Sequence, residues 1–95
     1  MLELKGRGAI VAGTRRIGAT VVRRLAREGV HLAIVYRSSR DVADELYAWI
    51  GADVDRACVI QADLASPPDV SRLVDEAQRQ LGDLSFCIDA AFDYP

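Results

Sequence analysis

The sequence has few of the residues on which several classes of protein depend. It contains two cysteines and one histidine among 95 residues. Two cysteines are too few for the disulfide framework of a small secreted domain. Because Cys58 and Cys87 lie in apolar runs, we expect both to be reduced core residues. His31 has no cysteine or acid at ligand spacing, so we predict neither a metal site nor a catalytic triad.

Long hydrophobic runs are also missing. No run approaches the roughly 20 apolar residues that a membrane span needs, and the first residues lack the apolar core of a signal peptide. These absences predict a cytoplasmic protein without a membrane partner. The length allows at most one domain, residues 1–95, and the 51% hydrophobic and 27% charged residues are typical of a chain that folds into a globule.

Charge is distributed unevenly along the chain. Residues 1–40 hold nine lysines and arginines against two acids, a net charge of +7, and residues 41–95 hold three against twelve, a net charge of −9. The basic part suits nucleic acid, a membrane surface or a small phosphorylated ligand. No aromatic residue is interleaved with Arg23, Arg24 and Arg27, which favours a solvated helix face, and we expect no nucleic-acid partner.

Short apolar runs rich in β-branched residues alternate with amphipathic segments. The runs at 9–12, 32–36, 57–62 and 84–91 are typical of strands buried in a parallel sheet. Between them, apolar residues recur at helical spacing in segments that end at glycines: 17–29, 38–51 and 66–82. The order βαβαβαβ predicts an α/β fold, a doubly wound parallel sheet with right-handed crossovers and helices on both faces.

Two serines are candidate helix caps. Ser66 precedes two prolines and predicts a helix start, and Ser38 with Asp41 three residues later resembles a capping box. On the second helix we expect Trp49 to share the core-facing side with Leu46, and Tyr47 to flank it.

A loop with two glycines joins the first strand to the first helix. In a doubly wound sheet ligands bind beyond the carboxyl ends of the strands, beside strand 1. The free N–H groups and positive dipole end of the helix suit a phosphate there, and the glycine spacing predicts dinucleotide binding. The alternative is that the glycines serve only the turn and the packing. The loop residues are Gly13, Thr14, Arg15, Arg16, Ile17 and Gly18.

The residues after the second strand bear on the choice of cofactor. Proteins that bind NAD place an acid there to hold the ribose 2′-hydroxyl, and this sequence has none. Arg37 and Ser38 offer a guanidinium and a hydroxyl that suit the 2′-phosphate of NADP, to which Arg15 adds a further charge. We therefore predict NADP(H) in preference to NAD(H). The alternative is that Arg37 is a solvated arginine and Ser38 only a helix cap.

These motifs resemble the short-chain dehydrogenase/reductase family over nearly all of the chain. Val11-Ala12-Gly13 stands where that family has Val-Thr-Gly, and Arg15-Arg16-Ile17-Gly18 is similar to the end of the loop in pteridine-reductase-like and ketoacyl-reductase-like members. Asp63-Leu64 resembles the family's Asp-Val or Asp-Leu, which faces the adenine ring. Asp89-Ala90-Ala91-Phe92 occupies the place of Asn-Asn-Ala-Gly at the end of strand 4.

The resemblance implies a Rossmann-like NAD(P)-binding domain with strand order 3-2-1-4, the N-terminal half of a larger fold. It also implies carbonyl–alcohol hydride transfer in the full-length family. The cofactor contacts that we predict are Gly13, Thr14, Arg15, Arg16, Ile17, Gly18, Arg37, Ser38, Asp63, Leu64 and Ala90.

The family's catalytic Tyr-x-x-x-Lys pair is absent from these 95 residues, in which the only lysine is Lys5. We therefore assign no catalytic residue and expect the chain to be inactive alone. The loop is one residue shorter than the family pattern, with Arg16 in the place of a glycine, and Phe92 replaces another glycine. These departures favour the alternative, a non-catalytic nucleotide-binding or oligomerisation module. An apolar fourth strand left without a neighbour predicts a homo-oligomer.

Overall fold

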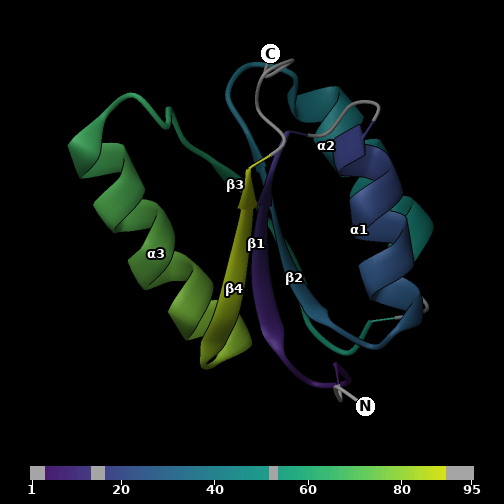
Figure 1. Ribbon diagram of the computed structural model, residues 1–95. Helices are drawn as coiled ribbons and strands as arrows, with labels where there is room; N and C mark the ends of the chain where they lie inside the picture. The colour runs from purple at the N-terminus through teal and green to yellow at the C-terminus, as the bar shows by residue number, and fades with distance from the viewer. Residues whose placement is uncertain (1–3, 14–16, 52–53, 90–95) are drawn as a thin grey trace.

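Strands and helices alternate along the whole described chain. The computed structural model describes residues 4–13, 17–51 and 54–89 (Figure 1). Its elements are β1 (Gly8–Ala12), α1 (Ile17–Arg27), β2 (His31–Tyr36), α2 (Arg40–Ile50), β3 (Ala57–Gln61), α3 (Pro67–Leu81) and β4 (Leu84–Asp89). None of the helices in these ranges is long and apolar enough to cross a membrane. The predicted element order is confirmed.

All strand pairs of the sheet are parallel, and the strand order is β3-β2-β1-β4. Helices α1 and α2 cover one face and α3 covers the other (Figure 1). The predicted Rossmann-like order 3-2-1-4 is therefore confirmed. The carboxyl ends of parallel strands lie at one edge of such a sheet, and the segments that follow the strands emerge there.

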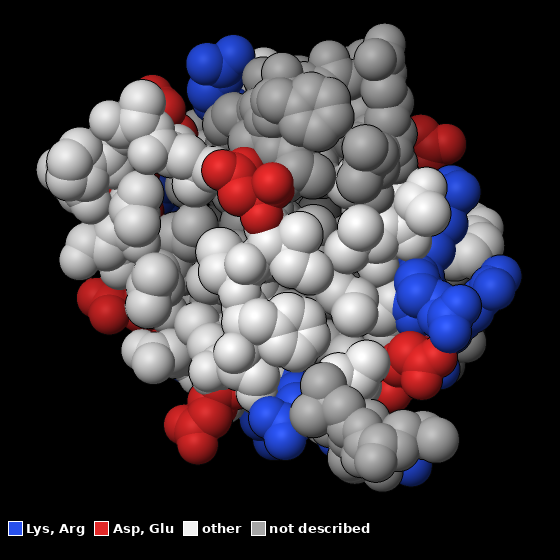
Figure 2. Space-filling view, in the orientation of Figure 1, with Lys and Arg blue, Asp and Glu red and all other residues white. Residues whose placement is uncertain are grey.

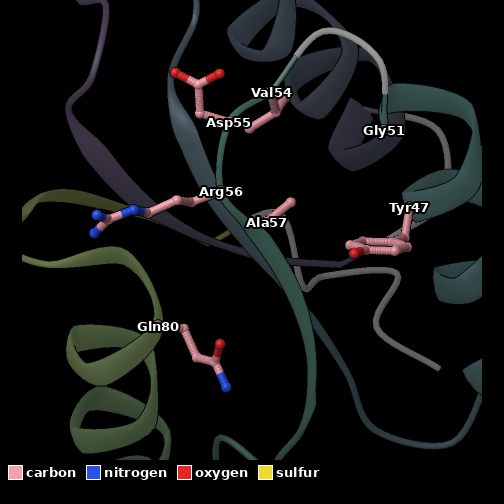
Figure 3. Close-up of a pocket in the computed structure, with 7 residues that line it drawn as sticks. All are labelled: Tyr47, Gly51, Val54, Asp55, Arg56, Ala57 and Gln80. Atoms are coloured by element: carbon pink, nitrogen blue, oxygen red, sulfur yellow. The ribbon is translucent and has the colours of Figure 1, made fainter.

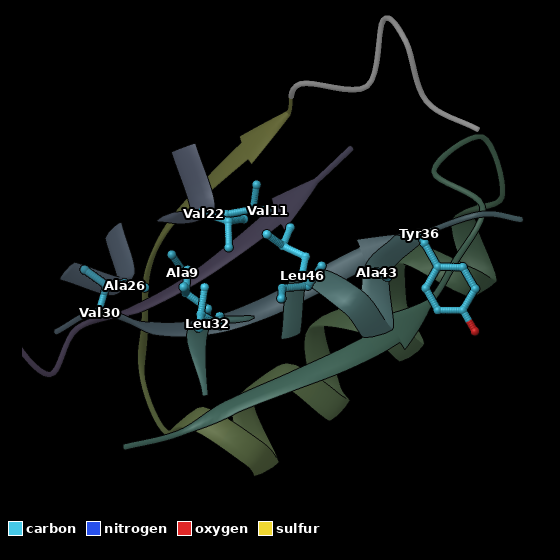
Figure 4. Close-up of a cluster of buried hydrophobic side chains, with 11 residues drawn as sticks. Ala9, Val11, Val22, Ala26, Val30, Leu32, Tyr36, Ala43 and Leu46 are labelled. Atoms are coloured by element: carbon cyan, nitrogen blue, oxygen red, sulfur yellow. The ribbon is translucent and has the colours of Figure 1, made fainter. Parts of the chain in front are cut away.

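The core consists of two apolar clusters, one on each face of the sheet. Because successive strand residues point to opposite faces, Val11 packs with α1 and α2 while its neighbour Ile10 packs with α3. The first cluster includes Val22 from α1 and Leu46 from α2 (Figure 4). Strands β1 and β2 are buried on both faces, as their uninterrupted apolar runs predict.

The start and the outer face of α2 differ from the prediction. The helix begins at Arg40 with Ser39 as its N-cap residue and without a side-chain capping hydrogen bond, so the predicted capping box of Ser38 and Asp41 is wrong. Trp49 is 52% exposed, and the guanidinium of Arg23 lies 4.8 Å from the centre of its ring. Because neighbouring helical residues are about 100° apart, the buried stripe through Leu46 and Ile50 leaves Trp49 at its border.

The start of α3 agrees with the prediction. Ser66 is its N-cap residue, and its hydroxyl accepts a hydrogen bond from the backbone N–H of Asp69 at 3.4 Å. Prolines occupy the first two helical positions, where no backbone N–H is needed. The helix ends before Gly82, whose φ of +84° lies in the region that favours glycine.

Strand β4 is covered less completely than the other strands. Its pairing with β1 shifts in register between Gly8 and Ala9, so Gly8 pairs with Leu84 and Ala9 with Phe86. Cys87 is exposed, and the expectation that it is a core residue is wrong, because α3 packs mainly over β3 and β2. Cys58 on β3 is half-buried, and both thiols are free.

Candidate functional site

The structure brings the described candidate residues to one edge of the sheet. Gly13 follows β1, Arg37 and Ser38 follow β2, and Asp63 and Leu64 follow β3. The segments are tied together by backbone hydrogen bonds, from the Gly13 N–H to the Val35 carbonyl at 3.4 Å and from Ala62 to Tyr36 at 3.0 Å. The other candidates, Thr14, Arg15, Arg16 and Ala90, lie outside the described residues.

Gly13 and Gly18 are in close contact on either side of the loop. Gly13 has a φ of +95°, a conformation that favours glycine, and both residues are buried. A Cβ atom on Gly18 would overlap the carbonyl oxygen of Gly13. The close contact therefore requires glycine at position 18, and the backbone conformation favours glycine at position 13. Ile17 begins α1, which has no acidic residue in its first turn, so no carboxylate there offsets the positive end of the helix dipole.

The residues after β2 present positive charge to solvent. Arg37 and Ser38 are both exposed, and the backbone carbonyl of Arg37 accepts a hydrogen bond from Gln61 Nε2 at 3.1 Å. Arg40 binds the Tyr36 hydroxyl at 3.4 Å and a carboxylate oxygen of Asp44 at 3.3 Å. Tyr36 and Asp44 raise the pKa of the Arg40 guanidinium, which remains a cation. Two guanidinium groups therefore flank this loop, which suits an anion.

The segment after β3 is held by α3. The backbone N–H of Asp63 donates to Asp69 Oδ2 at 2.9 Å, and Asp63 Oδ1 accepts a hydrogen bond from the Ala65 N–H at 2.9 Å. Asp63 is half-buried, and Leu64 is half-buried against the apolar cluster under α3. Asp63 is thereby fixed at the sheet edge with one carboxylate oxygen in a turn.

Sequence reasoning missed three residues at this edge. Arg72 on α3 donates from Nη2 to the backbone carbonyl of Gln61 at 2.7 Å, and the same nitrogen lies 3.7 Å from Asp69 Oδ2. Gln61, Asp69 and Arg72 thus connect α3 to the ends of β3 and β2. The only sequence signal for Gln61 is a polar residue at the end of an apolar run, and Arg72 has none, because its contact depends on how the helix packs.

Two hollows lie away from this edge. One, of about 380 Å³, is at the amino end of β3, where Tyr47, Arg56 and Gln80 are among its lining residues. In Figure 3 the polar ends of Asp55, Arg56 and Gln80 point in different directions, so they do not converge on a ligand. The other, of about 340 Å³, is lined by Thr20, Arg23, Arg24 and Arg27. Figure 2 shows basic side chains gathered on the side of the molecule that α1 forms.

Within residues 4–13, 17–51 and 54–89, no three or more His, Cys, Asp or Glu residues lie together so that they could hold a metal ion. The expectation that the chain holds no metal stays a prediction. The exposed guanidinium groups and the N-terminus of α1 instead make the carboxyl edge the candidate site for a phosphorylated ligand.

Comparison with known proteins bears on the identity of this ligand. The family model for short chain dehydrogenase matches residues 8–91. The hydroxynaphthalene reductase-like protein Arp2 of Metarhizium brunneum is 37% identical over 87 residues, which cover 90% of this chain and 33% of that protein. Hydroxynaphthalene reductase arp2 of Aspergillus fumigatus is 39% identical over 88 residues, which cover 92% of this chain and 32% of that protein. The chain spans about a third of the length of these relatives.

Solved structures show the same similarity. A short chain dehydrogenase from Burkholderia cenocepacia in complex with NADP superposes with a TM-score of 0.83 at 39% identity, over 90% of this chain and 36% of that one. A blue fluorescent protein from a metagenomic library in complex with NADPH superposes with a TM-score of 0.82 at 40% identity, over the same shares of the two chains.

Proposed function

This chain belongs to the short-chain dehydrogenase family, and on that premise we propose that its carboxyl sheet edge binds NADP(H) as the cofactor-binding part of an oxidoreductase. The family's members bind nicotinamide dinucleotides, and two similar structures are complexes with NADP and NADPH. The reaction that we propose for the whole protein is hydride transfer between the cofactor and a carbonyl or alcohol. In this reaction the chain's own residues bind and orient the cofactor.

We propose that three segments divide the cofactor between them. The loop from Gly13 to Gly18, with Thr14, Arg15, Arg16 and Ile17, and the start of α1 hold the pyrophosphate by backbone N–H groups. Arg37 and Ser38 hold the 2′-phosphate, and Asp63 and Leu64 lie against the adenine. Ala90, after β4, contacts the nicotinamide end.

The exposed Arg37 and Ser38 at the end of β2 are the observation that carries the proposed preference for NADP(H). An acid at this place would bind the two hydroxyls of an unphosphorylated ribose and repel a 2′-phosphate. Residues 37–40 contain two arginines, two serines and no acid. A guanidinium and a hydroxyl instead form charge-assisted hydrogen bonds with a phosphate.

A homo-oligomer formed through β4 belongs to the same proposal. Within the described residues β4 pairs only with β1, and we propose that a second copy pairs with its other edge. The non-catalytic module remains the alternative for the chain, supported by Arg16 in the place of a glycine. The cytoplasmic location expected from the sequence stays a prediction.

Replacing Arg37 tests the proposed 2′-phosphate site. In Arg37→Ala we expect NADPH to bind more weakly by about 1.5 to 3 kcal/mol, the contribution of a hydrogen bond to a charged group, and NADH to bind almost unchanged. Titration calorimetry of the chain with each cofactor measures both values. Arg24→Ala is the matched control, since Arg24 is an exposed arginine on α1 that pairs with Glu28. Equal losses for the two cofactors would reject the assignment of Arg37.

A further inference from the structure

We propose that Gln61 and Arg72 are positioning residues that hold Arg37 in place for the 2′-phosphate and so increase the preference for NADP(H). The inference rests on the function proposed above, and it concerns two residues that do not themselves contact the cofactor in this scheme. The three residues come from three elements: Arg37 follows β2, Gln61 ends β3, and Arg72 lies on α3.

The first contact fixes the backbone of Arg37. Gln61 is the register partner of Tyr36 on the neighbouring strand, and its side chain reaches one residue further to donate from Nε2 to the Arg37 carbonyl at 3.1 Å. That carbonyl belongs to the peptide group that joins Arg37 to Ser38. One hydrogen bond therefore orients the backbone between the two residues that we assign to the 2′-phosphate.

The second contact fixes Gln61. Arg72 Nη2 donates to the Gln61 carbonyl at 2.7 Å, a short, charge-assisted hydrogen bond of the stronger kind. The same nitrogen lies 3.7 Å from Asp69 Oδ2, which accepts a hydrogen bond from the Asp63 N–H at 2.9 Å. The first turns of α3 therefore hold the end of β3, and Gln61 connects that end to the residue that follows β2. Displacing Arg72 would remove this support from the end of β3 and, through Gln61, from the backbone of Arg37.

This support matters because the capping box that the sequence predicted for this loop is not formed. Only residues 37–39 separate β2 from α2, and Ser39 makes no side-chain capping hydrogen bond at the start of that helix. Arg37 is exposed, and ordering a long side chain on a ligand costs conformational entropy. A backbone already held in position lowers this cost, and it does so only for a ligand that carries the 2′-phosphate.

The test compares two probes that differ only in the 2′-phosphate. Adenosine 2′,5′-bisphosphate carries it and adenosine 5′-phosphate does not, and titration calorimetry gives the affinity of the chain for each. The variants are Gln61→Met, which keeps the side-chain length without an N–H donor, and Arg72→Met. The matched control is Arg79→Met, since Arg79 is an exposed arginine on the same helix that pairs with Glu76 at 3.9 Å.

We expect Gln61→Met and Arg72→Met each to weaken binding of the bisphosphate by about threefold to tenfold, the scale of one hydrogen bond, and of the monophosphate by less than about twofold. Arg79→Met removes the same charge and should change neither affinity. The double variant should lose no more than the worse single variant, because the two residues act through one chain of contacts. Losses that multiply would show that Arg72 acts on the phosphate independently and would overturn its role.

A readout without ligand separates positioning from a general loss of structure. The backbone amide of Ser38 shares a peptide group with the Arg37 carbonyl, so its NMR signal should shift in Gln61→Met and Arg72→Met and not in Arg79→Met. A shifted signal with unchanged bisphosphate affinity would overturn the inference. If the unmodified chain binds the two probes equally, the proposed 2′-phosphate site itself is wrong, and that result appears before any variant is made.

Discussion

Strands β2 and β4 are both apolar, yet they differ in how deeply their side chains are buried. In β2 every residue from Leu32 to Tyr36 is buried, whereas in β4 half-buried residues alternate with exposed ones. The difference follows from their neighbours. β2 lies between two strands with helices on both faces, and β4 is at the edge of the described sheet, where α3 lies mainly over the other half. An apolar run therefore indicates a strand, but the elements around it decide how much of that strand is buried.

The largest effect that we expect from this difference is on how much free energy of unfolding is lost when an isoleucine of each strand is truncated. Ile34 on β2 is fully buried, and Ile88 on β4 is half-buried against the same cluster. We expect Ile34→Ala to lower the free energy of unfolding by about 3 to 5 kcal/mol, and Ile88→Ala by about 1 kcal/mol, because a half-buried side chain leaves no closed cavity. Urea unfolding followed by circular dichroism measures both values.

Ile34→Val covers the case in which Ile34→Ala does not fold. It should cost about 1 kcal/mol, and Ile88→Val should cost less. Equal losses at the two positions would show that β4 is buried as deeply as β2 and would remove the contrast between them.

A second test weakens the pairing of β4 with β1. A Cβ atom on Gly8 would lie 2.7 Å from the Asp83 carbonyl oxygen, where the register of the β1–β4 pair shifts. We expect Gly8→Ala to destabilise the fold by about 1 to 3 kcal/mol, and to speed amide hydrogen exchange in β4 more than in β2.

Gly51→Ala is the control for this substitution. Gly51 has a helical φ of −55°, and a Cβ atom there would meet nothing closer than 3.6 Å, so alanine should be neutral or slightly stabilising. Slower exchange in β4 of Gly8→Ala, or equal acceleration in β2, would contradict the assignment of this contact to the β4 edge.

The smallest effect concerns the two thiols. Burial and the nearby Glu76 raise the pKa of Cys58 to about 11, while burial and Asp89 raise the pKa of the exposed Cys87. We expect iodoacetamide to modify Cys87 before Cys58 at pH 8, and both rates to rise with pH as thiolate forms. Mass spectrometry of timed samples measures the order, and modification of Cys58 first would contradict it.

The raised pKa of Cys58 also predicts that the stability of the fold decreases at alkaline pH. The ordinary pKa is 9.0, so an unfolded chain loses this proton at a lower pH than the folded chain does. The stabilisation from the neutral thiol is full below about pH 9 and is lost as the pH rises toward 11. Cys58→Ala should remove this part of the alkaline destabilisation.

Much of the fold follows from local sequence. The alternating runs and the Ser66 cap are confirmed, because each depends on residues close together in the chain. The strand order, which the resemblance to the family implied, is also confirmed. In β4 the sequence Leu-Ser-Phe-Cys-Ile-Asp alternates apolar and polar or small residues, and attention to that period would have predicted an exposed Cys87.

The remaining features depend on tertiary packing. The exposed Trp49 differs from the prediction by a single helical step, and the bonds of Gln61 and Arg72 depend on strand register and on the placement of α3. The positions of Gly13, Arg37 and Asp63 at one edge follow from the strand order. Their contacts with a cofactor stay predictions, as do those of Thr14, Arg15, Arg16 and Ala90.

The stacking of Arg23 on Trp49 has a practical consequence. Trp49 is the only tryptophan of the sequence, and it sits where α1 meets α2, half in solvent beneath a guanidinium group. Indole fluorescence responds to solvent and to neighbouring charge. The chain therefore carries a single intrinsic optical probe at the junction of these two helices, and their separation can be followed by emission without an added label.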